Sequence, residues 1–256
     1  NPLNYQDGID ILAFRENTEG LYSGVEFHPV PEPVSDVLNR HAPKIKRFQA
    51  VANEDMAISC RVFTREGCRS IIRDAFEYAK KMGRGNVTVV EKPNVIRETS
   101  GLMVRTAREV SKDYPGIELW ETNIDAMCMW LIKNPHTYSV LATSNMFGDI
   151  VSDLCAQLVG GLGFAASGNI GDDYAIFEPT HGSAPKYDGL YKVNPMAMLL
   201  ATKLMLEWLG ENSLAQRLEA SIAVVIREGQ VKTYDMGGSS TTLDVAREVA
   251  SKLGSA

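Results

Sequence analysis

The sequence predicts an α/β fold in which helices flank a mostly parallel β-sheet. Short apolar segments rich in β-branched residues alternate with longer segments of helical periodicity. Parallel strands of one sheet need such crossover helices between them. With 256 residues, of which 45% are hydrophobic and 23% charged, the chain has the composition of a packed protein of one or two domains.

Five short segments have the length and the apolar content of strands. They are Ile9–Phe14, Val87–Val90, Ile117–Trp120, Tyr138–Ala142 and Ala175–Phe177. The segments between them carry apolar residues at the spacing of helices with one buried face. This alternation predicts parallel strands joined by helices.

The clearest helix follows Thr64, whose hydroxyl suits the N-cap position, and ends at Gly83. Its apolar residues recur every three or four positions, so one face is buried. Another helix starts at Asn194, with Pro195 at the first helical position, and stops at Gly210. That helix is apolar nearly all round, which indicates burial or a subunit interface.

Residues 24–63 interrupt this alternation, and we expect them to form an appendage or a dimerisation arm. Two of their segments, Arg47–Ala52 and Ala57–Val62, are candidate strands of this separate excursion. Prolines punctuate the region at Pro29, Pro31, Pro33 and Pro43.

The net charge and the distribution of apolar residues argue against nucleic acid and a membrane as partners. The net charge is −6 and no block of about five or more like charges occurs in the sequence, so nucleic acid is not the expected partner. The most apolar run, Met196–Leu209, contains Thr202, Lys203 and Glu207, and therefore predicts no membrane span.

The cysteines form no C-x-x-C pair, and we interpret them as reduced packing residues of a cytosolic protein. They are Cys60, Cys68, Cys128 and Cys155. The first residues lack an initiator Met and the pattern of a signal peptide. We therefore expect the chain to begin partway through a longer protein.

Polar side chains follow four successive strand candidates. In an open α/β sheet, ligands bind beyond the carboxyl ends of the strands, so this recurrence favours a site there over ordinary polar loops. The segments are Arg15-Glu16-Asn17, Glu91-Lys92-Pro93-Asn94, Glu121 to Asp125, and Ser144 to Asp149.

Asp149 and Asp153 lie one turn apart on a predicted helix. Its buried stripe is expected to be Ile150, Val151, Leu154, Cys155 and Leu158. Like charges at this spacing repel by a few tenths of a kcal/mol unless a cation lies between them. Carboxylates favour Mg²⁺ or Mn²⁺, and Asp125 is a candidate third ligand. The alternative is a solvated acidic face.

Lys92, between a strand and Pro93, is a candidate general base, because desolvation or a nearby cation favours loss of its proton. Tyr22 is a matching candidate acid, and Arg15 can bind a carboxylate through two parallel hydrogen bonds. Lys92 or Tyr22 taken alone is more typical of an ordinary surface side chain, and it is the combination with Arg15 that predicts a site.

Two glycine-containing loops differ in their interpretation. Gly161-x-Gly163-x-x-Ala166 matches a loose dinucleotide fingerprint but follows a helix, so we interpret it as a chance match. The small-residue turn of Glu178–Tyr187 follows a strand and lets a flat ring approach the backbone. Lys186 and Tyr187 there offer a charge and a hydroxyl to a phosphate.

These segments resemble the β-decarboxylating dehydrogenases, the family of isocitrate, homoisocitrate, isopropylmalate and tartrate dehydrogenases. The match lies in Arg15–Gly24, Lys92-Pro93-Asn94, Asn145–Asp153 and His181–Pro195, in family order. The resemblance implies the isocitrate/isopropylmalate dehydrogenase-like fold with a small dimerisation arm. It also implies metal-dependent oxidative decarboxylation of a small 2-hydroxy acid.

The resemblance implies a role for each matching residue. Arg15 resembles the arginine that binds the substrate carboxylate, and Tyr22 the acid that protonates the enol. Lys92 resembles the proton-transfer lysine, which reaches into the neighbouring subunit's site, with Asn94 beside it at the substrate.

The implied metal ligands for Mg²⁺ or Mn²⁺ are Asp125, Asp149 and Asp153, with Asp125 contributed by the neighbour. The protein would then be a homodimer with shared active sites, located in the cytoplasm, or in the mitochondrial matrix if it is eukaryotic.

The implied adenosine-binding residues are His181, Gly182, Ser183, Ala184 and Asn194. The set Lys186, Tyr187 and Tyr234 resembles the phosphate-binding residues of NADP-dependent isocitrate dehydrogenases, so NADP is expected, with NAD as the alternative. Gly237-Gly238 departs from the pattern, because some NADP enzymes carry an arginine there.

The resemblance also predicts the domain organisation. Residues 1–23 would start a small domain, 24–63 form the arm, 64–160 complete the small domain with the metal and catalytic residues, and 161–256 form the C-terminal part of a large nucleotide-binding domain. The resemblance also implies a further N-terminal segment with additional substrate arginines, which we expect to precede Asn1 in the longer protein.

Isocitrate is the expected substrate. Alternatives are a homoisocitrate, isopropylmalate or tartrate dehydrogenase using NAD, a non-catalytic regulatory or truncated subunit, and a metal-dependent hydrolase.

Overall fold

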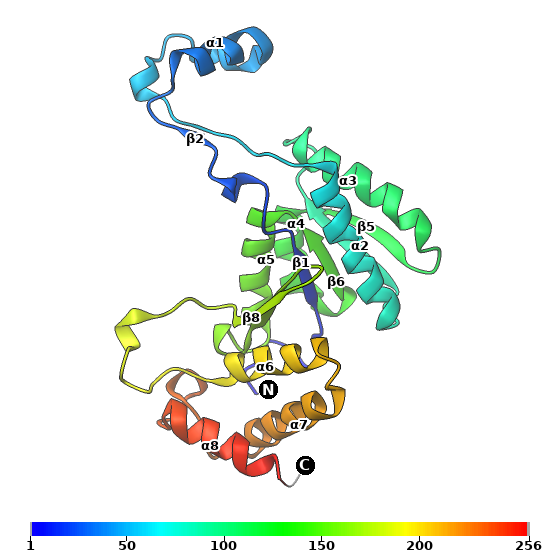
Figure 1. Cartoon of the computed structure of the whole chain (residues 1–256), viewed down its shortest axis with the longest axis vertical. Helices are drawn as coiled ribbons and strands as arrows, with labels where there is room; N and C mark the ends of the chain where they lie inside the picture. Colours follow the sequence, from blue (N-terminus) through cyan, green and yellow to red (C-terminus); the bar gives the residue numbers. More distant parts are fainter. Residues whose placement is uncertain (1, 255–256) are drawn as a thin grey trace. The chain divides into compact units, whose positions relative to one another are not determined.

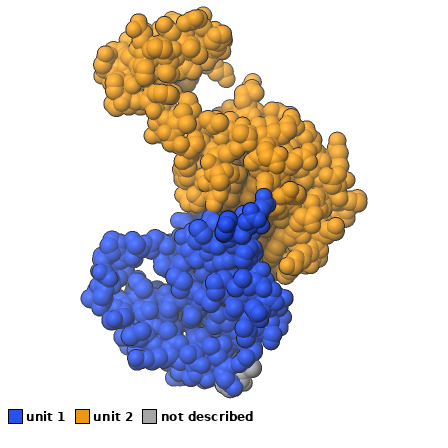
Figure 2. Space-filling model, viewed as in Figure 1, with its two compact units in different colours: residues 1–9, 152–256 blue, residues 10–151 orange. Residues whose placement is uncertain are grey.

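The computed structural model describes residues 2–254. The chain forms two compact units, one of residues 10–151 and one of residues 1–9 with 152–256 (Figure 2). The predicted division into small domain, arm and large domain stays a prediction. In the described part of the chain, no helix is both long and apolar enough to cross a membrane.

Residues 10–151 contain a four-stranded sheet in the order β1-β6-β4-β5. Its strands are β1 (Leu12–Arg15), β4 (Asn86–Glu91), β5 (Glu118–Asn123) and β6 (Val140–Thr143). All neighbouring pairs are parallel, which confirms the predicted α/β class. Four of the predicted strands form this sheet, with their ends shifted by up to three residues.

Helices cover both faces of this sheet (Figure 1). α2 (Arg65–Lys81) and α3 (Thr99–Val110) lie on one face, and α4 (Ile124–Lys133) and α5 (Asn145–Leu158) on the other. The core on the first face combines residues of α2 and α3 with alternate residues of β4 and β6. Alternation places the other residues of these strands against α4 and α5.

The start of α2 confirms the predicted N-cap. The Thr64 hydroxyl accepts a hydrogen bond from the Gly67 N–H at 3.0 Å, which satisfies one of the free donors of the first turn. Cys68 in the next turn is buried, and this burial raises the pKa of its thiol to about 12. It therefore behaves as a packing residue, as predicted.

Residues 24–63 extend away from the sheet (Figure 1). They contain β2 (Glu26–Phe27) paired antiparallel with β3 (Ile58–Ser59), and the helical segments α1 (Glu32–His41), η2 (Pro43–Phe48) and η3 (Asn53–Asp55). Across this fully described segment, Val30 is the only buried residue.

The prediction of a strand over Arg47–Ala52 is wrong. Its first residues end the 3₁₀ helix η2, and the N–H groups of Gln49 and Val51 bond to carbonyls three residues earlier. These donors are therefore not available to a β-ladder. The other candidate, Ala57–Val62, forms a strand only at Ile58–Ser59.

The second unit pairs β7 (Ala166–Ile170) with β8 (Ala175–Pro179) in an antiparallel hairpin. Three helices follow: α6 (Met196–Trp208), α7 (Asn212–Glu228) and α8 (Thr242–Lys252). The strand β8 was predicted, whereas β7 was not, because Ser167, Gly168 and Asn169 give it little strand character. α6 begins one residue after Pro195, where the Asn194 side chain accepts the Met196 N–H at 3.0 Å.

Candidate active site

The parallel sheet brings the predicted polar residues to one edge. Its strands run in the same direction, so β1, β4, β5 and β6 all end on the same side. Arg15 is the last residue of β1, and Lys92 follows β4. Asp125 and Asp149 lie in the helices that follow β5 and β6.

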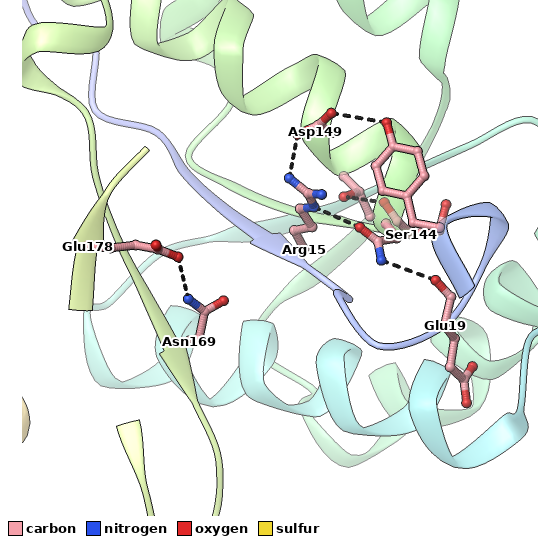
Figure 3. Close-up of polar contacts among 9 residues, drawn as sticks. Arg15, Glu19, Ser144, Asp149, Asn169 and Glu178 are labelled. Carbon is pink, nitrogen blue, oxygen red and sulfur yellow. Dashed lines mark hydrogen bonds and ion pairs between the residues drawn. The ribbon is translucent and has the colours of Figure 1, made fainter. Parts of the chain in front are cut away.

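The first cluster at this edge forms around Arg15 (Figure 3). Its Nη1 lies 2.6 Å from Asp149 Oδ1, and its Nε donates to Asn145 Oδ1 at 3.0 Å. The Tyr22 hydroxyl donates to the other Asp149 oxygen at 3.0 Å. Three side chains that the sequence predicted to act together, Arg15, Tyr22 and Asp149, are therefore in direct contact.

This cluster remains accessible to a ligand. The side chains of Arg15 and Asp149 are 32% and 47% exposed, and ion pairs of this kind contribute at most about 1 kcal/mol. A ligand can therefore replace the ion pair at little cost. Partial burial, the hydrogen bond to Asp149 and the charge of Asp149 raise the pKa of the Tyr22 hydroxyl. Tyr22 thus keeps its proton, as an acid must.

Gly148 allows Arg15 to lie this close to α5. A Cβ on Gly148 would be 2.4 Å from Thr143 Oγ1 and 2.6 Å from Arg15 Cγ, both too close for any real contact. The sequence analysis did not single out this residue. Its signal is a glycine inside an otherwise helical pattern, which often marks a close approach of another segment.

The second cluster at the edge pairs Lys92 with Asp125. The Lys92 ammonium donates to the Asp125 carboxylate, and this hydrogen bond lowers the pKa of Asp125. The Lys92 side chain is 21% exposed, whereas that of Asp125 is 68% exposed. Asn94 is exposed in the turn after Pro93, where the N–H groups of Val95 and Ile96 bond to the Lys92 carbonyl.

The predicted spacing of Asp149 and Asp153 holds, because both lie on α5, one turn apart. The expectation that Ile150 belongs to the buried stripe is wrong, since 47% of it is exposed. Viewed down the helix, Asp153 is rotated by about 40° from Asp149, and Ile150 is rotated by about 100° from Asp149. Ile150 therefore flanks the exposed face that carries the two aspartates.

Carboxylate oxygens are the ligands that Mg²⁺ and Mn²⁺ prefer, so the Asp149–Asp153 donor set fits such an ion. Within residues 2–254, however, no three His, Cys, Asp or Glu side chains gather into a group able to hold a metal. Asp125 is paired with Lys92 instead. One chain therefore offers part of a metal shell, and the three-aspartate assignment stays a prediction.

The second unit contains the predicted adenosine-binding loop. His181 Nδ1 lies 2.8 Å from the Gly182 carbonyl oxygen, and Gly182 and Ser183 are exposed. Ala184 adopts a left-handed conformation with a φ of 45°, which is uncommon for residues other than glycine.

Asn194, the remaining predicted adenosine-binding residue, is buried and donates to Asp235 Oδ2 at 3.0 Å. A Cβ on Gly163 would lie 2.8 Å from that Asp235 oxygen. The Gly161–Ala166 segment follows α5 and contains a 3₁₀ helix, which agrees with its interpretation as a chance match to the dinucleotide fingerprint. Gly163 instead lets Asn194 and Asp235 approach the backbone.

Lys186, Tyr187 and Tyr234 come together as predicted, and Lys192 joins them. The rings of Tyr187 and Tyr234 are 5.7 Å apart between centroids. The Lys192 ammonium lies 4.7 Å from the Tyr234 ring centroid, and that of Lys186 lies 4.9 Å from the Tyr187 centroid.

A hydrogen bond with Tyr234 and the charges of both lysines lower the pKa of the Tyr187 hydroxyl. The positive potential of the lysines, which lowers the pKa of Tyr187, also favours binding of an anion at this place. The sequence analysis missed Lys192, since only the fold of the loop returns it to the tyrosines.

The parallel α/β unit, with polar side chains at the ends of its strands, belongs to the class of open-sheet α/β proteins in which ligands bind beyond the carboxyl ends of the strands. Residues 1–249 match the family model described as isocitrate/isopropylmalate dehydrogenase. The chain belongs to the isocitrate/isopropylmalate dehydrogenase family.

Individual relatives carry names from both branches of this family. The chain is 44% identical to the 3-isopropylmalate dehydrogenase of Archaeoglobus fulgidus, and the match covers 96% of this chain and 68% of that protein. It is 37% identical to the probable isocitrate dehydrogenase (NAD) subunit alpha, mitochondrial, of Caenorhabditis elegans, over 96% of this chain and 63% of that protein. The chain thus spans roughly two thirds of the length of the curated relatives it matches.

Among solved structures, the isocitrate dehydrogenase of Methylococcus capsulatus is similar, with a TM-score of 0.86 and 38% sequence identity. The match covers 98% of this chain and 69% of that one. It confirms the isocitrate dehydrogenase-like fold expected from the sequence.

Proposed function

We propose that this chain takes part in the metal-dependent oxidative decarboxylation of a 2-hydroxy acid, with isocitrate as substrate and NADP as oxidant. The observation that carries this proposal is the contact of Arg15 and Tyr22 with the two oxygens of Asp149. It joins a carboxylate-binding group, a proton donor and a metal ligand in one cluster at the strand ends.

In this mechanism, Arg15 binds a substrate carboxylate and Tyr22 delivers a proton to the product-forming carbon. Asp149 and Asp153 would hold Mg²⁺ or Mn²⁺ together with Asp125 of a second copy. A bound divalent cation would polarise the substrate oxygen, and NADP would take the hydride.

The cluster also explains how ligand binding would rearrange these side chains. Both Asp149 oxygens are engaged by Arg15 and Tyr22. If Asp149 held a cation instead, Arg15 and Tyr22 would both be available to the substrate. Within residues 2–254, Asp125 pairs with Lys92 and does not gather with Asp149 and Asp153, which is the arrangement expected of a homodimer in which each copy completes the other's site.

The test is reduction of NADP and of NAD by the full-length gene product with Mn²⁺ and each of four acids: isocitrate, homoisocitrate, isopropylmalate and tartrate. We expect isocitrate with NADP to give the highest kcat/KM. Faster turnover of isopropylmalate with NAD would correct both substrate and cofactor. Absence of reduction with all four acids would refute the proposed activity.

The choice of NADP predicts a specific effect of Lys192→Ala. Loss of one charge-assisted contact to a phosphate costs about 1.5–3 kcal/mol, so kcat/KM for NADP should fall about 10- to 100-fold. The value for NAD, which lacks that phosphate, should change little. The matched control is Lys252→Ala, since this lysine pairs with Glu228 and Glu248. Equal losses with both cofactors would contradict a phosphate contact of Lys192.

A further inference from the structure

A buried carboxylate lies directly behind the candidate active site. Glu91 is the last residue of β4, immediately before Lys92, and it is completely buried. A buried charge needs partners that compensate for its lost hydration. Glu91 has no role in the proposed reaction, so its contacts need another explanation.

Glu91 links the end of β4 to the start of two helices. Its Oε1 accepts the backbone N–H of Ser144 at 3.2 Å, and its Oε2 accepts the hydroxyl of Ser100 in α3. Ser144 immediately precedes α5, and its carbonyl accepts the Gly148 N–H at 2.7 Å in the first turn. One carboxylate therefore holds the residue from which α5 begins.

Arg61 completes this buried cluster from the side of the arm. Its Nη2 lies 3.8 Å from Glu91 Oε2 and donates to Ser144 Oγ at 3.4 Å. Its guanidinium lies over the rings of Phe63 and Phe147, at 4.9 Å and 5.1 Å from their centroids. Phe147 belongs to the first turn of α5, so Arg61 contacts both that turn and the residue immediately before it.

A gain in folding stability is a poor explanation for the buried ion pair of Glu91 and Arg61. Arg61 Nε and Nη1 are buried without a hydrogen-bond partner among the described residues. Buried ion pairs are commonly no more stabilising than apolar residues of the same volume. What the pair does provide is directional contacts to Ser144 and Phe147.

We propose that Glu91 is a positioning residue that fixes the first turn of α5 against the end of β4, and thereby sets Asn145 and Asp149 where they meet Arg15. This inference rests on the proposed function, since it concerns the same metal-binding helix. Arg61 assists Glu91 by holding Phe147 and the Ser144 hydroxyl.

The test compares three variants of the full-length gene product. Glu91→Gln removes the charge and leaves Arg61 buried without its partner. The double variant Arg61→Met, Glu91→Leu removes both charges and all contacts to Ser144, yet should keep the thermal stability of the wild type, because apolar residues replace a buried pair. Glu109→Gln is the matched control, since Glu109 pairs with Arg65 at the exposed surface.

Two measurements are made on each variant: Mn²⁺ affinity, and hydrogen exchange of the backbone amides of residues 144–149. A positioning role predicts faster exchange in this segment and about 10- to 100-fold weaker Mn²⁺ binding for both the single and the double variant. The control should match the wild type. A merely structural role predicts that the double variant regains wild-type values in both measurements, and this result would overturn the proposal.

The exchange measurement separates this proposal from the proposed function. If the wild type binds no Mn²⁺, the proposed metal-dependent reaction fails. Exchange at residues 144–149 then still decides whether Glu91 holds α5: unchanged exchange in the double variant refutes the positioning role, and faster exchange supports it.

Discussion

Asp149→Asn is expected to lower kcat with the proposed hydroxy acid about 1,000-fold or more, even at saturating Mn²⁺. Asparagine keeps the size of the side chain but removes the charge that would bind the cation and that holds Arg15 and Tyr22. A 1,000-fold lower kcat corresponds to a loss of about 4 kcal/mol of transition-state stabilisation, which is what we expect when the cation is no longer held. The measurement is steady-state turnover together with Mn²⁺ affinity.

The control for this variant is Asp113→Asn, which changes an exposed carboxylate in η4 (Ser111–Asp113) of the same unit. It should turn over like the wild type. If Asp149→Asn retained more than a tenth of wild-type turnover, the metal would have to bind elsewhere.

Gly148→Ala should destabilise the protein and weaken substrate binding together. The added methyl group would collide with Thr143, which is fully buried, and with the Arg15 stem. Such overpacking costs about 1–3 kcal/mol, which outweighs the gain of about 1 kcal/mol that alanine gives over glycine in a helix. Displacement of Arg15 should raise the KM for the substrate. Urea unfolding and steady-state kinetics measure the two effects.

Gly101→Ala provides the matched control in α3. Its Cβ would meet only the end of the Arg105 side chain, at 2.9 Å from Nη1, and that flexible group can move. This variant should be as stable as the wild type or more stable by up to about 1 kcal/mol. Equal stability and equal KM for Gly148→Ala and the wild type would show that Arg15 does not depend on this glycine.

Local signals made much of the fold predictable. The Thr64 cap and the periodicity after it define α2, and the spacing of Asp149 and Asp153 follows from one helix. The polar strand ends were predictable because parallel strands end on one side. The helix α1 in the arm was harder to predict. It begins after Pro31, and prolines are compatible with the first turn of a helix. The high density of prolines in this region, however, suggested an irregular chain.

The features that the sequence analysis missed depend on contacts between distant segments. Gly148 matters because Arg15 lies against it, and Lys192 because its loop returns to Tyr234. The Glu91–Arg61 pair joins residues 30 positions apart (91 − 61) at 3.8 Å. No periodicity or local motif encodes such pairings, which arise only when the sheet and its helices are assembled.

The strand order has a consequence for how the chain folds. β6 lies between β1 and β4, so β1 has no neighbour in the sheet until residues 140–143 are available. During synthesis, the ribosome must therefore release more than half of this chain before Arg15 can dock beside its partners. Loop closure over such separations is slow, so the part of the sheet around Arg15 should be the last part of this unit to mature.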